Sequence, residues 1–239
     1  MPDQISPQFA DAWEFASGVS GWLTEAQGEL LWTSTERLPE DALVVEIGSH
    51  QGRSTTVLAA AVQASGGQVV AVDPFVDGRL FGGRKTRDIF EANLAAAQLT
   101  DTVELLPEYS TVARKSWSRP IDYLYIDGKH DYWTLSDDLK WSEHLPEGAP
   151  VLIHDCYSSI GVTLGILAHV LPSRRLRYER RAGSLALFRV GKPSVADRLR
   201  IVGEIPWWLR NVVVKVLLRL RLGVVAKALF GHRGPYDPY

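Results

Sequence analysis

Five short apolar runs alternate with segments of helical length between residues 42 and 154, and this alternation restricts the fold more than any other feature of the chain. The runs cover residues 42–47, 68–72, 103–106, 121–126 and 150–154. Four of them are almost wholly apolar, which is typical of parallel strands buried on both faces. The intervening segments 53–65, 86–99, 109–117 and 133–145 predict helices, the third of them short. The pattern therefore predicts βαβ units and an α/β fold with a doubly wound sheet.

The flanking segments extend this prediction at both ends. Apolar residues at helical spacing before residue 40, among them Phe9 and Leu30, predict an N-terminal helical cap over residues 1–40. After a further helix at about 160–171, the runs 174–180 and 183–190 are split at Ala182-Gly183 and predict an antiparallel hairpin at the sheet edge. We therefore expect a Rossmann-like domain over 41–192, mostly parallel, and a basic helical tail over 193–239.

The net charge of −2 hides an uneven distribution. From Arg198 onward the balance is +6, so the preceding residues carry −8. The overall charge argues against a dedicated nucleic-acid binder, and we expect no nucleic-acid partner. The single cysteine, Cys156, excludes an intrachain disulfide and favours a reducing compartment. Because the first residues show no apolar segment behind a basic start, we expect no signal peptide and a cytoplasmic location.

The basic tail has two interpretations. From Pro206 the sequence predicts a helix whose charges recur too often for it to span a bilayer. In the favoured interpretation the helix packs on its own domain or on a second subunit, and we therefore expect a homodimer. The alternative is peripheral membrane contact through residues 206–230, with Trp207 and Trp208 at the level of the lipid headgroups.

Two glycines follow the first predicted strand, in the pattern E-x-G-x-x-x-G. Gly48 can adopt the positive φ of a tight turn, and Gly52 lets the next helix approach closely. The pattern is neither G-x-G-x-x-G nor a phosphate-binding loop ending in G-K-S/T. Glu46 favours the cationic end of a ligand, and Ser49 and Ser54 belong to the same candidate binding site at the carboxyl end of the strand.

An acidic residue also ends the second strand. Asp73 stands where a carboxylate can accept both hydroxyls of a ribose. Together with Glu46 and the glycine turn, it resembles the S-adenosylmethionine site of class I methyltransferases. That resemblance implies a contact on the adenine side from Ser110, after the third strand. The alternative is a short structural turn with two solvated acids.

Asp127 and Asp155 follow the fourth and fifth strands and should meet at the same edge of the sheet. Two carboxylates repel unless a cation lies between them, and a hard divalent cation such as Mg²⁺ prefers oxygen ligands. Such an ion could also hold a substrate hydroxyl and lower its pKa.

The motifs IDGKHDY (126–132), TLSDDL (134–139) and LIHDCY (152–157) resemble those of small class I O-methyltransferases that act on sugars and other small molecules, the macrocin-type and cephalosporin-hydroxylase-like sequences. The resemblance extends over about residues 30–190 and more distantly to the metal-dependent catechol-type enzymes. It implies Asp127 and Asp155 as metal ligands, Asp127 also at the cofactor, and His130 as general base. Cys156 stands where a third oxygen ligand is usual, so water would complete the metal site.

Two other histidines compete with His130 for the role of base. His144 ends a helix that returns toward the start of the fifth strand, so we expect it at the opposite edge of the sheet. His154 precedes Asp155, and strand alternation predicts that it points to the other side of the sheet as a structural residue.

The sequence therefore predicts an S-adenosylmethionine-dependent O-methyltransferase acting on a hydroxyl of a sugar or oligosaccharide, with Mg²⁺ or another divalent cation and with Asp127 and His130 as catalytic residues. Within the family that the chain resembles, a methylmannose-oligosaccharide O-methyltransferase is one candidate. The alternatives are an oxidoreductase that binds a dinucleotide in the same sheet and a non-catalytic, membrane-associated binding module.

Overall fold

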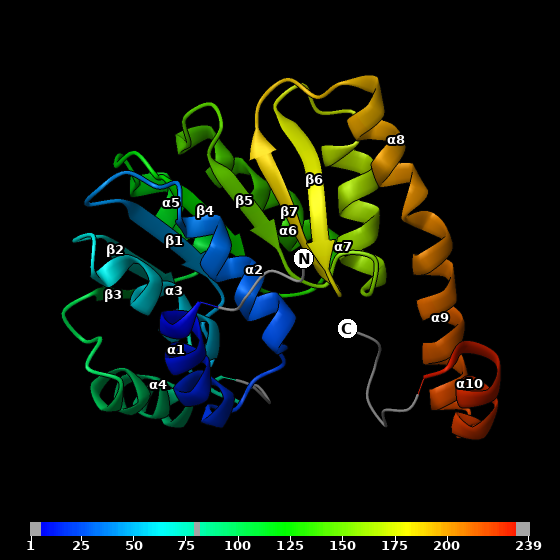
Figure 1. Cartoon of the computed structure of the whole chain (residues 1–239), viewed down its shortest axis with the longest axis horizontal. Helices are drawn as coiled ribbons and strands as arrows, with labels where there is room; N and C mark the ends of the chain where they lie inside the picture. Colours follow the sequence, from blue (N-terminus) through cyan, green and yellow to red (C-terminus); the bar gives the residue numbers. More distant parts are fainter. Residues whose placement is uncertain (1–5, 79–81, 233–239) are drawn as a thin grey trace.

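A seven-stranded sheet forms the middle of the molecule (Figure 1). The structure is a computed structural model that describes residues 6–78 and 82–232. In the order β3-β2-β1-β4-β5-β7-β6, the first five strands run parallel and β7 is antiparallel to both β5 and β6. The bounds are β1 (Leu43–Ile47), β2 (Gln68–Val72), β3 (Val103–Leu106), β4 (Tyr123–Ile126), β5 (Pro150–Ile153), β6 (Leu176–Ala182) and β7 (Leu185–Val190). The predicted Rossmann-like sheet with its antiparallel edge hairpin is confirmed.

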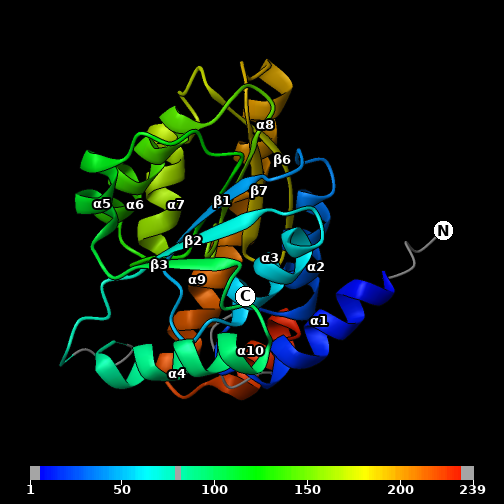
Figure 2. The same ribbon diagram turned by 90° about the vertical axis from the view of Figure 1, so that its left-hand side faces the viewer.

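Helices cover both faces of the sheet, which Figure 2 shows nearly edge-on. One face carries α1 (Pro7–Gly18), α2 (Glu25–Thr35), α3 (Arg53–Gln63) and α4 (Arg84–Ala96). The other face carries α5 (Ser110–Ser116), α6 (Tyr132–Asp138), η1 (Leu139–His144), α7 (Ile160–Gly165) and η2 (Ile166–Val170). Each layer encloses its own apolar core, as expected for a doubly wound sheet.

Strand alternation explains the two cores. In β1, Val44 packs into the core on the α3 side, whereas Val45 and Ile47 pack into the core on the α6 side. Because both faces are covered, all three side chains are buried. Phe9 and Leu31 from the N-terminal helices join the same core as Val44. The N-terminal segment is therefore packed directly on the sheet.

Several predicted helices differ from those of the structure. The segment 133–145 divides into α6 and the tighter η1, and 160–171 divides into α7 and the wider η2. The tail forms three helices in place of one: α8 (Val195–Gly203), α9 (Ile205–Arg219) and α10 (Gly223–Phe230). The domain boundaries at residues 40 and 192 stay predictions, and the outermost residues of both end segments lie outside the described range.

Candidate active site

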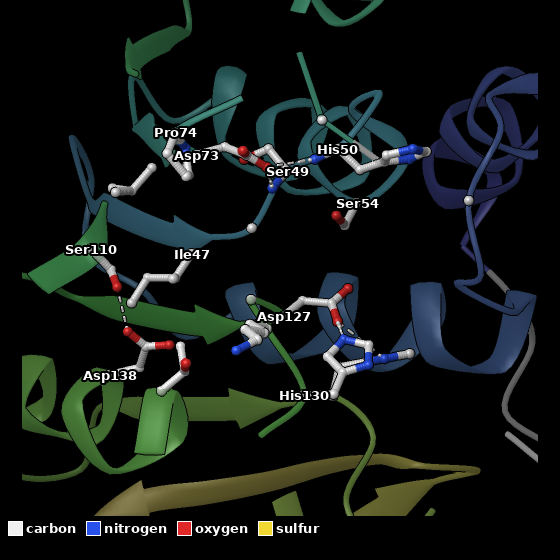
Figure 3. Close-up of a pocket in the computed structure, with 18 of the residues that line it drawn as sticks. Ile47, Ser49, His50, Ser54, Asp73, Pro74, Ser110, Asp127, His130 and Asp138 are labelled. Atoms are coloured by element: carbon white, nitrogen blue, oxygen red, sulfur yellow. Dashed lines mark hydrogen bonds and ion pairs between the residues drawn. The ribbon is translucent and has the colours of Figure 1, made fainter. Parts of the chain in front are cut away.

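A cavity of about 940 Å³ opens at the carboxyl ends of β1, β2 and β4. Parallel strands present their carboxyl ends together at this edge, where ligands of doubly wound sheets bind. The structure brings most of the predicted site residues into its wall (Figure 3): Gly48, Ser49, Ser54, Asp73, Ser110, Asp127 and His130. The predicted residues Glu46, Gly52 and Asp155 lie behind this wall.

The glycine turn lies directly against the loop that follows β4. Gly48 has a φ of 87°, and its N–H donates to the Val72 carbonyl over 2.9 Å. A Cβ atom at Gly48 would lie 2.3 Å from the Asp127 carbonyl oxygen. Gly52, with a φ of 92°, faces the Phe90 ring, which a Cβ atom would approach to 3.1 Å. Gly48 thus forms part of the floor, whereas Gly52 serves the packing of α3 on α4.

Asp73 fastens the glycine turn to the end of β2. One of its carboxylate oxygens accepts hydrogen bonds from the N–H groups of Ser49 (3.0 Å) and His50 (3.1 Å). The other accepts from the Phe75 N–H over 2.9 Å. The carboxylate therefore fixes three backbone donors while it faces the cavity.

Glu46 differs from its prediction. Alternation along β1 places its side chain on the α3 side, the side of Val44, where it is fully buried. Its two carboxyl oxygens accept hydrogen bonds from the hydroxyls of Ser54 and Thr55, each over 2.5 Å. Burial raises the pKa of Glu46 to about 7, against the effect of these hydrogen bonds. Glu46 thus supports Ser54 from behind the wall and does not itself face a ligand.

His130 lies between the two predicted carboxylates. Its Nδ1 is 2.5 Å from an Asp155 oxygen, and its Nε2 is 3.3 Å from Asp127 Oδ1. Figure 3 shows the His130 ring beside Asp127. The second Asp127 oxygen accepts from the Tyr125 hydroxyl over 2.9 Å. Asp155 therefore orients the imidazole from behind, on the side away from Asp127.

The prediction for His154 is wrong. Its Nδ1 lies 3.2 Å from Asp127 Oδ1 and 3.5 Å from Asp155 Oδ1, so it belongs to the same cluster and lines the cavity. Strand alternation fails here because β5 ends at Ile153 and Asp155 has a φ of 58°. The Nε2 atom of His154 lies 3.4 Å from the side-chain oxygen of Gln27, a buried residue of α2.

The four groups of this cluster shift one another's pKa values. Burial raises the pKa of Asp127, but His154 and His130 outweigh it and hold the pKa well below its usual range. Burial lowers the pKa of His130, yet Asp127 and Asp155 together raise it to about 10. In the same way, Asp127 raises the pKa of His154 against the effect of burial. Of the pair His130 and Asp127, the imidazole of His130 therefore holds the proton and the carboxylate of Asp127 is ionised.

The cluster does not fit the predicted magnesium site. Asp127 and Asp155 do not face a common ion, because His130 stands between them. The ligand atoms that gather within 4.8 Å belong to Asp127, His130 and His154. Two imidazole nitrogens and one carboxylate oxygen suit a borderline ion such as Zn²⁺, whereas Mg²⁺ prefers oxygen ligands. Cys156 does not complete the set, because its buried thiol donates to the Ile153 carbonyl over 3.3 Å.

A second polar pair lies across the cavity from His130. Ser110 donates to Asp138 over 2.5 Å, and both residues line the wall. Burial raises the pKa of Asp138 to about 6. The sequence predicted Ser110 but not Asp138, although Asp138 belongs to the TLSDDL motif. Its position in a helix gave no sign that α6 would turn it toward the end of β3.

The connection between α1 and α2 supplies another part of the wall, residues 20–23. Arg53, the first residue of α3, donates to the carbonyls of Ala16 (3.0 Å), Ser17 (2.6 Å), Gly21 (2.7 Å) and Leu23 (3.1 Å). A contribution of the N-terminal helices to the acceptor pocket was expected, but no motif in residues 1–40 indicates which of them reach it. His144, in contrast, lies at the opposite edge as predicted, since its carbonyl accepts from Ile121, before the start of β4.

Part of the chain matches a known protein family. Residues 45–156 match the protein family described as a methyltransferase domain. That range runs from β1 to just beyond β5 and contains every predicted site residue.

Solved structures share the fold across most of their length. The S-adenosylhomocysteine-bound methyltransferase PaMTH1 from Podospora anserina is 14% identical, with a TM-score of 0.61 over 79% of this chain and 89% of that one. The O-methyltransferase TomG from Streptomyces achromogenes, in complex with S-adenosylmethionine, is 16% identical, with a TM-score of 0.56 over 79% and 91%. A methyltransferase from Geobacter sulfurreducens is 20% identical, with a TM-score of 0.55 over 81% and 91%. The strand order and these likenesses identify the architecture of this chain as the Rossmann-like methyltransferase fold.

Proposed function

We propose that this protein is an S-adenosylmethionine-dependent O-methyltransferase that acts on a hydroxyl group of a small polar acceptor. The observation that carries this proposal is the position of His130, which Asp155 orients within the same cavity that the glycine turn and Asp73 enclose. The match of residues 45–156 to a methyltransferase domain supports it and disfavours a dinucleotide-dependent oxidoreductase.

The cavity fits the proposed cofactor. Its volume of about 940 Å³ is at the upper end of the range for small-molecule sites. Gly48 offers bare backbone, Asp73 a carboxylate for ribose hydroxyls, and the Ser110–Asp138 pair hydrogen-bonding groups for an adenine edge. When bound, S-adenosylmethionine supplies an electrophilic methyl group on a sulfonium sulfur. The negative charge of Asp127 on the cavity wall complements that cation.

His130 is the base in this proposal. With Nδ1 held by Asp155, its Nε2 can accept the proton of an acceptor hydroxyl, which then becomes the nucleophile. Because the neighbouring carboxylates raise the pKa of His130 to about 10, its neutral form accumulates as the pH approaches that value, and we expect turnover to increase with pH over this range. The donor atoms gathered at His130 do not suit Mg²⁺, so that ion has no part in this proposal.

The acceptor in this proposal is a sugar or an oligosaccharide. Trp22 and Tyr109 line the cavity with exposed fractions of 43% and 49%, so their ring faces are accessible. Lys129 and His130, which line the same cavity, offer hydrogen-bonding groups to hydroxyls. Aromatic rings next to a few polar groups are a common way to hold a polar ring with apolar faces.

A labelled-methyl assay against a panel of sugars, oligosaccharides and phenolic acceptors tests the proposal. We expect transfer to at least one sugar hydroxyl, and a thermal shift with S-adenosylhomocysteine but not with NAD. His130→Ala should reduce turnover by about 10²-fold or more while the affinity for S-adenosylhomocysteine stays the same. Stabilisation by NAD alone, or full turnover by His130→Ala, would contradict the proposal.

A further inference from the structure

The C-terminal helices expose an apolar stripe. Seven aliphatic side chains of α8, α9 and the residue directly after α9 have exposed fractions between 42% and 74%. These are Val195, Leu199, Val202, Leu209, Val213, Val216 and Leu220, named here the apolar stripe. On α9 the intervals of four, three and four residues keep the last four on one side of the helix. In Figure 1, α8, α9 and α10 form the right-hand margin of the molecule.

The opposite side of α9 is fully engaged with the rest of the fold. Trp207 and Trp208 pack against the core on the α6 side, and Val214 is completely buried. The side chain of Asn211, also buried, donates to the Tyr157 carbonyl over 3.0 Å. Arg181 lies 4.0 Å above the Trp207 ring. These contacts fix the rotation of α9, so the apolar stripe faces outward because the helix is held that way.

These contacts also correct part of the sequence prediction. The alternative interpretation placed the two tryptophans at the headgroup level of a membrane, but they are half-buried against the sheet domain. The helix therefore packs on its own domain, as the favoured interpretation predicted. A separate surface, made by aliphatic residues, remains exposed.

Along α9 and α10, the charges beside the apolar stripe are all of one sign. Residues 205–232 contain five cationic side chains and no acidic one. The cations are Arg210, Lys215, Arg219, Arg221 and Lys227. The two acids of residues 195–204 are already engaged: Asp197 lies 3.4 Å from Arg200, and Glu204 is bonded to Arg181 (2.8 Å) and to the Tyr178 hydroxyl (2.7 Å). A two-fold contact between copies would bring cations against cations, whereas an anionic surface would complement them.

We propose that the apolar stripe and its flanking cations dock on an anionic lipid bilayer. The aliphatic side chains would enter the interfacial region while Lys and Arg reach the headgroups, the mode of binding of interfacial amphipathic helices. No helix among the described residues is long and apolar enough to cross a bilayer. Attachment along the surface is the geometry that a 15-residue helix with three cations permits.

Vesicle co-sedimentation of the full chain tests this proposal. We expect binding to phosphatidylcholine vesicles that contain roughly one third phosphatidylglycerol, and much weaker binding to phosphatidylcholine alone or when NaCl is raised from about 0.1 M to about 0.5 M. The double variant Leu209→Asp/Val216→Asp removes two exposed apolar side chains, 54% and 50% exposed, and adds two negative charges. It should bind at least about tenfold more weakly.

A matched control carries the same substitutions elsewhere on the surface. Leu164→Asp/Val112→Asp changes side chains that are 45% and 50% exposed, on α7 and α5. This control should bind vesicles like the wild type, and circular dichroism should show that both variants are folded. Equal loss in the two variants, no wild-type binding to anionic vesicles, or a dimer in light scattering that dissociates only in the stripe variant would each overturn the proposal.

Discussion

Replacing Gly48 by alanine tests whether the glycine turn after β1 and the loop after β4 form one rigid unit. Two costs combine at this position. Alanine at a φ of 87° lies in the left-handed region, which costs an L-residue about 1–2 kcal/mol. Its Cβ would also lie 2.3 Å from the Asp127 carbonyl oxygen and 2.8 Å from Gly128 Cα, both backbone atoms that no side-chain rotation can move. Forcing such atoms apart adds about 1–3 kcal/mol.

Gly148 provides a control for the first cost alone. It has the same φ of 87°, but a Cβ atom there would meet nothing within 4 Å. Urea unfolding should therefore show that Gly148→Ala loses about 1–2 kcal/mol, and that Gly48→Ala loses a further ~1–3 kcal/mol. Isothermal titration with S-adenosylhomocysteine should give at least about tenfold weaker binding for Gly48→Ala, equivalent to ~1.4 kcal/mol, and unchanged binding for Gly148→Ala. Equal losses of stability in the two variants would refute the close approach between turn and loop.

Three further measurements test other parts of the site. Since the pKa of Glu46 rises from 4.5 to about 7 on folding, its contribution to the free energy of unfolding is largest below pH 4.5 and is lost as the pH rises through 7. The stability of Glu46→Gln relative to wild type should therefore increase by about 3 kcal/mol between pH 4.5 and pH 8.5. A difference that stays constant with pH would argue against the raised pKa. Arg53→Met should cost about 2–4 kcal/mol in urea unfolding and speed hydrogen exchange in residues 16–23, because four hydrogen bonds to carbonyls are lost. The control Arg87→Met, which breaks only a surface ion pair with Glu91, should cost no more than about 1 kcal/mol, so similar losses would contradict this role for Arg53. Adding Mg²⁺ to EDTA-treated protein should leave turnover in the labelled-methyl assay unchanged, since the donor set does not suit Mg²⁺, and a loss in EDTA that added Mg²⁺ restores would contradict this view of the cluster.

The sheet could be predicted from the sequence because strands that are buried on both faces consist almost wholly of apolar residues. The predicted runs 68–72 and 103–106 coincide with β2 and β3, and the edge hairpin lies within two residues of its prediction. Helix subdivision was not predictable in this way. The change from α6 to η1 and from α7 to η2 depends on how each helix packs on the sheet.

The candidate site was predictable where a residue directly follows a strand. Gly48, Asp73 and Asp127 reach the cavity because parallel strands end together. His154 could not be placed by alternation, since the strand ends one residue before it and the chain then turns at a positive φ. Asp138 and the wall segment 20–23 come from elements whose docking is a tertiary property that periodicity does not reveal.

The close contact between Gly48 and the Asp127 loop has a consequence for how the specificity of this protein could diversify. At Gly48 the floor of the cavity leaves no space for a side chain, so a substitution there lowers the stability of the fold and is selected against. The mouth, in contrast, is formed by the 20–23 connection and by exposed residues such as Tyr109 and Lys129. Libraries aimed at new acceptors should therefore vary the mouth, where substitution is tolerated, and leave the floor as an invariant frame for the methyl donor.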